Sequence, residues 1–178
     1  MVFSSTDFLF VFLPAFLLAC FASGGRAANP VLLAFSLLFY FIGEGVFLLV
    51  MIASIALNTA FGRAIGASSG RARRRWLAGG VTANLALLGY FKYTGFFAAD
   101  VAGIEGAWWA EGIHLPLGIS FFTFQAISYL VDIARGDGPV ERNPFTVGTY
   151  IAMFPQLVAG PIVRFASVAE AQIGRAHV

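Results

Sequence analysis

Apolar segments separated by short polar or glycine-containing stretches run through most of the chain. They span residues 8–21, 31–42, 46–61, 76–97, 115–133 and 145–159. About 20 apolar residues in a helix cross a hydrocarbon core, and a helix satisfies its own backbone groups there. Charged residues make up 11% of the chain, whereas a soluble domain carries about 25%. We therefore expect an all-α, polytopic transmembrane protein with about five to six spans.

The first apolar segment, residues 8–21, fits either a transmembrane helix or the hydrophobic part of a cleaved signal peptide. A signal peptide begins with a positively charged region, but residues 1–7 contain no Lys or Arg and include Asp7. We interpret this segment as a transmembrane helix in which Pro14 is tolerated as a kink. The single cysteine, Cys20, excludes a disulfide framework or a cysteine cluster within the chain.

Segment 115–133 carries a row of polar side chains along an otherwise apolar helix. Gln125, Ser128, Tyr129 and Asp132 follow the spacing i, i+3, i+4 and i+7, which places them on one helical face. A carboxylate near the centre of a membrane helix costs about 2.5–3.5 kcal/mol on insertion scales. We expect this polar seam to face protein or water, and we take Gln125, Ser128 and Asp132 as candidate cavity-lining or structural residues.

A simpler interpretation of the polar seam stays open. Asp132 lies near the end of the segment and Arg135 follows at i+3, so the two charges also fit an ion pair at the membrane interface. Gln125 and Ser128 fit interhelical hydrogen bonds, which contribute only about 0.6–2 kcal/mol each. Packing therefore explains these residues at least as well as contact with a substrate.

The last apolar segment, residues 145–159, is interrupted by Pro155 and ends at Gly160 and Pro161. A broken segment is either a kinked span or a re-entrant element. Non-helical backbone at that depth is tolerated only where it is buried in protein or lines a cavity. Pro155, Gly160, Pro161 and the following Arg164 are therefore further candidate cavity-lining or structural residues.

Arginines mark one set of connections between the apolar segments. The stretch 62–75 is strongly basic and contains glycines and serines, so we expect a flexible loop there. Other arginines of this set are Arg26, Arg135 and Arg142. Since basic loops face the cytoplasm, Glu44 and the acidic stretch 98–114 fall on the outside. The pattern predicts a multi-pass membrane protein with its N-terminus outside, and it does not suggest a nucleic-acid partner.

The chain contains no recognisable catalytic signature: no GxSxG elbow, HExxH pair, phosphate-binding loop or spaced Cys/His cluster. His114 lies at the predicted outer boundary of segment 115–133 without an evident orienting partner, so we interpret it as an interfacial residue. Lys92, among aromatic residues, fits a cation that reaches toward the headgroups, with a buried lysine near a substrate as the alternative. We expect no catalytic residue, metal or bound cofactor in this chain.

The last six residues, IGRAHV, resemble one translated frame of a common sequencing-library adapter. We therefore divide the chain into a membrane part, residues 1–172, and a non-native tail, residues 173–178. His177 lies in this tail and carries no functional weight.

Four stretches together resemble one family of membrane enzymes. They are MVFSSTDFLFVFLP at 1–14, GYFKY at 89–93, LPLGISFFTFQAISYLVDIARG at 115–136, and FPQLVAGPIVRF at 154–165. In combination they are similar to the membrane-bound O-acyltransferases, and within these to the membrane subunits of bacterial alginate O-acetyltransferases. The likeness extends over residues 1–172.

The resemblance implies a ring of tilted helices around a thin central region that holds the catalytic centre. It also implies an enzyme of the bacterial inner membrane that moves an acyl group across this membrane from a cytoplasmic donor, for which acetyl-CoA is a candidate. Periplasmic partners would deliver the group to an exported polysaccharide such as alginate. The family's active-site histidine follows in a later, Trp/Arg-rich region that has no match here. The chain thus resembles an N-terminal fragment, which we expect to be inactive alone.

Two non-enzymatic alternatives remain, a transporter subunit and a membrane scaffold of a polysaccharide export system. A transporter predicts an internal repeat and a substrate site between discontinuous helices. The sequence has one broken segment and no repeat of fixed period, which weakens this alternative. A scaffold predicts a stable assembly that needs no acyl donor.

Overall fold

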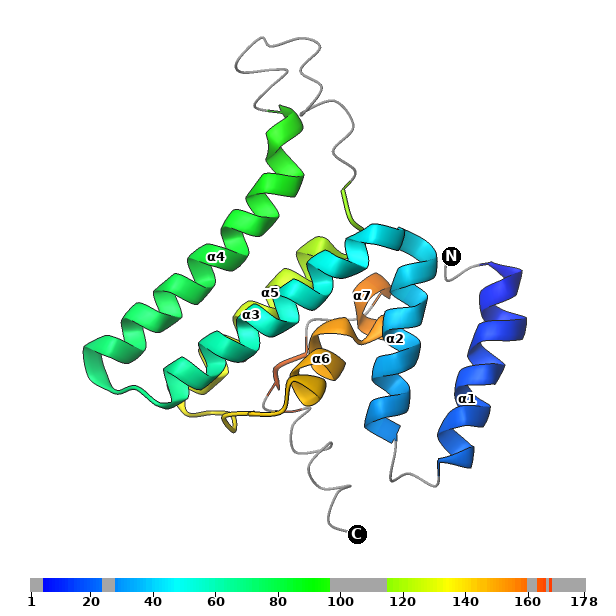
Figure 1. The fold of residues 1–178 in the computed structure, drawn as a ribbon, viewed down its shortest axis with the longest axis horizontal. Helices are drawn as coiled ribbons and strands as arrows, with labels where there is room; N and C mark the ends of the chain where they lie inside the picture. The colour runs from blue at the N-terminus through cyan, green and yellow to red at the C-terminus, as the bar shows by residue number, and fades with distance from the viewer. Residues whose placement is uncertain (1–4, 24–27, 97–114, 160–162, 166, 168–178) are drawn as a thin grey trace.

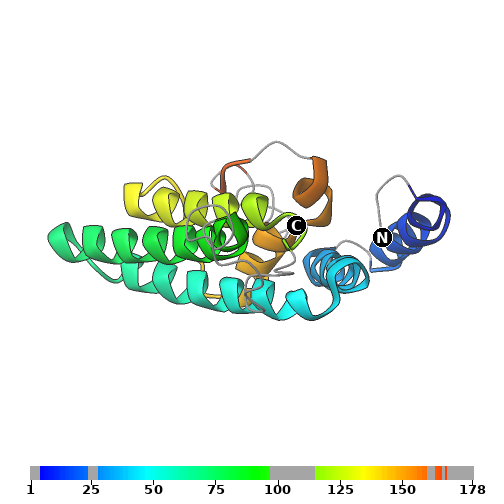
Figure 2. The ribbon, with the colours of Figure 1, turned by 90° about the horizontal axis from the view of Figure 1, so that it is seen from above.

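The computed structural model describes residues 5–23, 28–96, 115–159, 163–165 and 167. Every regular element in these ranges is a helix, and none of the described residues lies in a strand (Figure 1). The predicted all-α class is therefore confirmed for the described part of the chain. Figures 1 and 2 show three long helices side by side, with the N-terminal helix at the other end of the molecule.

The first helix starts with a wide turn. A π-helical turn, η1 (Phe8–Phe12), continues directly into α1 (Leu13–Ala22). The backbone N–H of Leu13 donates to the carbonyl of Phe8, five residues earlier. Pro14 has no N–H for a helical bond of its own, and the widened turn immediately before it accommodates this loss. The expected interruption at Pro14 is thus a π-turn in an otherwise continuous helix.

The next two helices are joined by one tight turn. α2 (Ala28–Glu44) leads through the 3-10 turn η2 (Gly45–Phe47) into α3 (Leu48–Gly66). Gly45 has a φ of 56°, which a residue without a Cβ adopts at no steric cost. Among the described residues, Ala28–Gly66 is the one helical stretch long and apolar enough to cross a membrane, and Phe8–Ala22 is a shorter apolar helix.

The expected flexible loop over 62–75 is wrong. α3 continues to Gly66 and α4 (Gly70–Phe96) begins four residues later, so only 67–69 connect the two helices. Ala and Arg are among the strongest helix formers, and they dominate this stretch. Gly70, with a φ of 54°, provides the turn. The arginines therefore lie on helix ends, where their positions are fixed.

The C-terminal part folds as α5 (Ile119–Arg135), α6 (Pro144–Ala152) and α7 (Phe154–Ala159). Asn143 caps α6, because its side chain accepts a 3.0 Å hydrogen bond from the N–H of Phe145. The predicted break in the last apolar segment lies at Met153, not at Pro155. Pro155 occupies the first turn of α7, where its missing N–H costs no hydrogen bond.

The core is formed where α3, α4 and α5 pack closely. A Cβ atom added to Gly62 of α3 would lie 2.5 Å from the hydroxyl of Tyr129 on α5. One added to Gly80 of α4 would lie 2.6 Å from Leu130. Small residues at such positions allow helix backbones to approach closely in membranes. Glycines thus set the spacing of this three-helix layer.

A second cluster holds the N-terminal helix on the rest of the molecule. It consists of the buried aromatic rings Phe8, Phe12, Phe39 and Phe154. The rings of Phe12 and Phe154 meet edge to face with centroids 5.5 Å apart. The other face of this helix is apolar and exposed, as at Phe10 and Phe21. Exposed apolar surface of this extent is typical of a membrane or protein contact.

Candidate functional site

The polar seam predicted on α5 is buried against protein. Gln125, Tyr129 and Asp132 are at most 4% exposed, and Ser128 is half-buried. The expectation that the seam faces protein, not lipid, is therefore confirmed. Asp132 is buried while Arg135 is exposed, so the two side chains occupy different environments.

At its N-terminal end the seam meets α7. The Nε2 of Gln125 donates a hydrogen bond to the Oε1 of Gln156. Three other buried polar atoms nearby in the fold have no hydrogen-bond partner among the described residues: Gln125 Oε1, Thr123 Oγ1 and Tyr40 Oη. The ring of Tyr40, on α2, packs against Phe122. Because buried polar atoms are normally paired, these atoms of α2 and α5 leave spare hydrogen-bonding capacity inside the described part of the molecule.

Further along, the seam meets α6 at Tyr150. The hydroxyl of Tyr150 donates a 2.7 Å hydrogen bond to the carbonyl of Val163. Ser128 and Asp132 both lie close enough to this hydroxyl to interact with it electrostatically. The structure therefore brings Ser128 and Asp132 together around one buried tyrosine, which sequence spacing on α5 does not reveal.

Tyr129 connects the seam to the turn after α5. Its hydroxyl donates a 3.3 Å hydrogen bond to the carbonyl of Glu141. The side chain is fully buried against Gly62. This contact fixes the polar turn 136–143 on the end of α3.

A second buried polar contact was not predicted. Asn58 of α3 donates to Asn84 of α4 at 3.1 Å, and Asn84 donates back at 2.7 Å. Both side chains are at most 1% exposed. The available signal was one asparagine in each of two apolar segments, because such residues in membrane helices bond across helices.

The other predicted residues lie elsewhere. Pro155 is exposed on α7, and Arg164 is exposed. Gly160 and Pro161 lie outside the described residues, as do His114 and His177. Lys92 is exposed, with its ammonium nitrogen 5.6 Å from the centre of the Tyr93 ring. A cavity-lining role for the seven candidate residues stays a prediction.

The described residues bring together no three His, Cys, Asp or Glu side chains able to hold a metal ion. The polar side chains of α5 and their partners provide hydrogen-bonding groups in an otherwise apolar environment. Such groups orient a polar substrate or hold helices together.

Comparison with known proteins identifies relatives along the whole chain. It is 41% identical to a Pseudomonas syringae pv. tomato protein named "Probable alginate O-acetylase AlgI", over 99% of this chain and 36% of that protein. A protein of the same name from Pseudomonas aeruginosa is also 41% identical, over 99% of this chain and 35% of its own length. A Helicobacter pylori "Peptidoglycan O-acetyltransferase" is 34% identical over 92% of this chain and 37% of its own length.

No family model matches the chain, and no solved structure matches it. The chain spans about a third of the length of the curated relatives it matches. Its long apolar stretch indicates a membrane location. The resemblance to membrane O-acyltransferases of the alginate O-acetylase type, drawn from four sequence stretches, is confirmed: over 99% of its length this chain is similar to proteins named as probable alginate O-acetylases, and it corresponds to about a third of their length.

Proposed function

We propose that this chain is the N-terminal part of a membrane O-acyltransferase that transfers acetyl or other acyl groups across the membrane for O-acetylation of an exported polysaccharide such as alginate. The observation that carries the proposal is the 41% identity to alginate O-acetylases along 99% of the chain. The buried polar layer on α5 supports it, because a path for a polar substrate through a membrane protein needs such a lining.

In this proposal the described helices form the wall of the enzyme, and the catalytic residues lie in the remainder of the protein. In that remainder, a neutral imidazole would accept the proton of the acceptor's hydroxyl group while the hydroxyl oxygen attacks the acyl carbonyl. Hydrogen bonds in a low-dielectric interior would stabilise the resulting oxyanion, which then collapses as the bond to the donor breaks and the donor's leaving group takes the proton from the imidazolium. Residues 1–172 alone should therefore bind neighbouring segments and catalyse no turnover.

The arrangement of arginines supports a cytoplasmic location for one end of the molecule. α3 ends, α4 begins and α5 ends at the same end, which lies at the left of Figure 1. The arginines there are Arg63, Arg71, Arg73, Arg74, Arg75 and Arg135. By the positive-inside rule this end faces the cytoplasm, in a multi-pass protein of the bacterial inner membrane whose N-terminus is outside.

This orientation fits a cytoplasmic acyl donor, for which acetyl-CoA is the candidate, and periplasmic partners that modify the polysaccharide. No cofactor is required by the proposed chemistry, since the acyl donor is a substrate. The lipid bilayer is the other partner, and nothing in the chain suggests nucleic-acid binding.

Deletion of the gene in its host tests the function. We expect the ester-linked acetyl content of the exported polysaccharide, measured by proton NMR, to fall to background and to recover when the natural gene is restored. An unchanged acetyl content in the deletion strain would refute the proposed activity.

The similarity to a peptidoglycan O-acetyltransferase favours a second candidate, in which the acceptor is peptidoglycan. The same strain separates the two, because loss of acetyl groups from muropeptides alone identifies the second acceptor. A non-enzymatic scaffold would instead lower the amount of exported polysaccharide without changing its acetyl content per sugar.

A further inference from the structure

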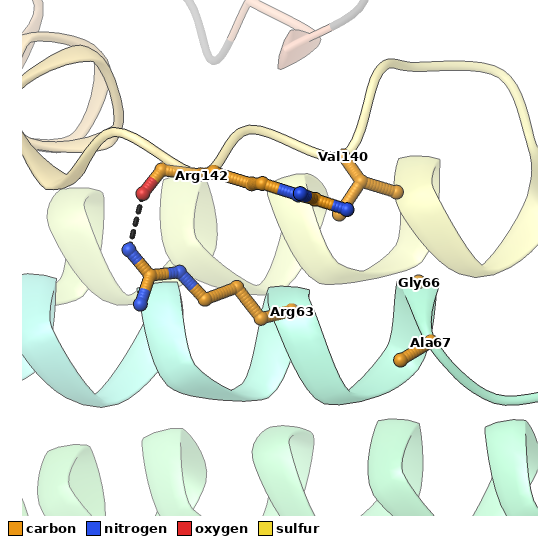
Figure 3. Close-up of a pocket in the computed structure, with 5 residues that line it drawn as sticks. All are labelled: Arg63, Gly66, Ala67, Val140 and Arg142. Atoms are coloured by element: carbon orange, nitrogen blue, oxygen red, sulfur yellow. Dashed lines mark hydrogen bonds between the residues drawn. The ribbon is translucent and has the colours of Figure 1, made fainter.

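A hollow lined by two arginines lies at the arginine-rich end of the molecule. It has a volume of about 300 Å³ and is formed between the end of α3 and the turn that follows α5 (Figure 3). Its lining residues are Arg63, Gly66, Ala67, Val140 and Arg142. This volume lies at the lower end of the range of small-molecule sites, about 300–1,000 Å³.

Among the described residues, neither arginine of this hollow forms an ion pair with an acidic side chain, although Glu141 and Arg63 both lie near the Tyr129 hydroxyl. The Arg63 guanidinium donates to the backbone carbonyl of Arg142, and no described residue is a partner of the Arg142 guanidinium. The adjacent acidic residue, Glu141, accepts a 2.8 Å hydrogen bond from the N–H of Asn143 at the start of α6. Each guanidinium has five N–H donors, so both retain free donors toward a ligand.

Close packing holds the two walls of the hollow together. A Cβ atom added to Gly66 would lie 2.5 Å from Val140. On the adjoining turn of α3, Gly62 is covered by Tyr129, whose hydroxyl is bonded to the carbonyl of Glu141. The backbone segments that carry Arg63 and Arg142 are therefore held together by glycine contacts and hydrogen bonds to backbone carbonyls, whereas the guanidinium of Arg142 itself makes no described contact.

The surroundings add positive charge. α4 begins directly after the short connection 67–69. Its first turns contain Arg71, Arg73, Arg74 and Arg75. Arg73 is tied to this connection by a 3.0 Å bond from its Nε to the carbonyl of Ser68. The field at the hollow therefore favours an anion.

We propose that this hollow binds a phosphate group between Arg63 and Arg142. A planar guanidinium matches two phosphate oxygens at once, and the half-open shape admits a phosphate attached to a larger molecule. Two sources present this chemistry at the cytoplasmic side, the headgroup of an anionic phospholipid and a soluble phosphate ester. The inference does not depend on acyl transfer, because it concerns binding alone.

The test uses the natural gene product, delipidated in a phosphate-free maltoside detergent and analysed by native mass spectrometry. One arm adds inorganic pyrophosphate as the soluble probe, and the other adds phosphatidylglycerol as the lipid probe. We expect a bound species in at least one arm, and we expect Arg142→Gln to weaken it about tenfold, the loss of one charge-assisted contact. Arg142 is the primary target because its side chain supports no described contact.

The matched control is Arg74→Gln, which removes the same charge from the exposed start of α4 and should change binding less than twofold. A second variant, Val140→Phe, fills the hollow from the exposed turn without altering charge, and it should weaken binding as well. Binding of pyrophosphate identifies a soluble ester, and binding of phosphatidylglycerol alone identifies a lipid headgroup. Absence of binding in both arms overturns the proposal, as do equal losses in the Arg142 and Arg74 variants.

Discussion

Polar side chains are buried at several points of this structure, among them Asn58, Asn84 and Asp132. In the membrane interior a buried amide or carboxyl has no water to bond, so a partner in the protein lowers the free-energy cost of burying it. Asp132 could be predicted as buried because its row of polar neighbours defines one face of a helix. Its location beside Tyr150 could not, because the two lie on different helices and their contact depends on tertiary packing.

The reciprocal amide pair of Asn58 and Asn84 leads to a stability prediction. Asn84→Leu leaves the Asn58 amide buried with one partner fewer, so we expect the free energy of unfolding to fall by about 1–2 kcal/mol. The double variant Asn58→Leu with Asn84→Leu should recover most of this loss, because neither amide then needs a partner. Thermal unfolding of the natural gene product in detergent measures both.

Thr82→Ala, at an exposed position of the same helix, is the control for the asparagine variants. If Asn84→Leu unfolds at the same temperature as this control, the hydrogen bonds between Asn58 and Asn84 do not hold α3 and α4 together.

Asp132 provides a functional prediction. Asp132→Asn keeps the size of the side chain and removes its charge, so we expect the fold to persist and polysaccharide acetylation to fall about fivefold or more, as intramembrane acidic residues usually serve function. Ser128→Ala, which removes the hydroxyl beside the same tyrosine, should have a smaller effect. If the Asp132→Asn variant acetylates the polysaccharide fully at an equal protein level, Asp132 has a structural role only.

At the scale of elements, the apolar segments predicted most helices, while their ends were harder to predict. The stretch 62–75 has loop-like glycines and serines, yet the helix propensity of Ala and Arg extends α3 and α4 almost to each other. Likewise, Pro155 indicated the break before α7 but lies just after it, because proline fits the first turn of a helix. Composition therefore indicates roughly where one helix ends and the next begins, and local backbone geometry determines the residue at which this happens.

The close contact of α3 with α5 makes Gly62 sensitive to substitution. Gly62→Ala would place a methyl group 2.5 Å from the Tyr129 hydroxyl, in a fully buried site. We expect the free energy of unfolding to fall by about 1–3 kcal/mol, although alanine is the better helix former. Gly89→Ala, where the added Cβ meets nothing within 4 Å, should be neutral or slightly stabilising.

Thermal unfolding of these two glycine variants compares packing with helix propensity directly. Equal stability of both would show that the tyrosine ring moves aside at little cost, and that glycine does not set the helix spacing.

At the scale of the whole molecule, arginines gather at one end, and by the positive-inside rule we expect this end to face the cytoplasm. α3, α4 and α5 bring this end together, whereas η2 lies at the opposite end of α3 (Figure 1). The sequence predicted this asymmetry from charge alone. The seam's contacts with α6 and α7 were not predictable, because partners such as Gln125 and Gln156 are 31 residues apart.

Cysteine labelling tests the orientation. In a Cys20→Ser background, a cysteine replacing Val46, which is 78% exposed in η2, should react with a membrane-impermeant maleimide in intact spheroplasts. A cysteine replacing Arg74 should react only after the membrane is permeabilised. The reverse pattern would place the arginine-rich end outside.

The central claim is that this chain is part of a larger membrane O-acetyltransferase, and the genomic reading frame beyond codon 172 tests it most directly. We predict that the frame continues through several more apolar spans and reaches a histidine in a Trp/Arg-rich stretch, with IGRAHV absent from the genome. A stop codon directly after Val178 in clean genomic DNA would contradict the claim and leave a short membrane protein without catalytic machinery.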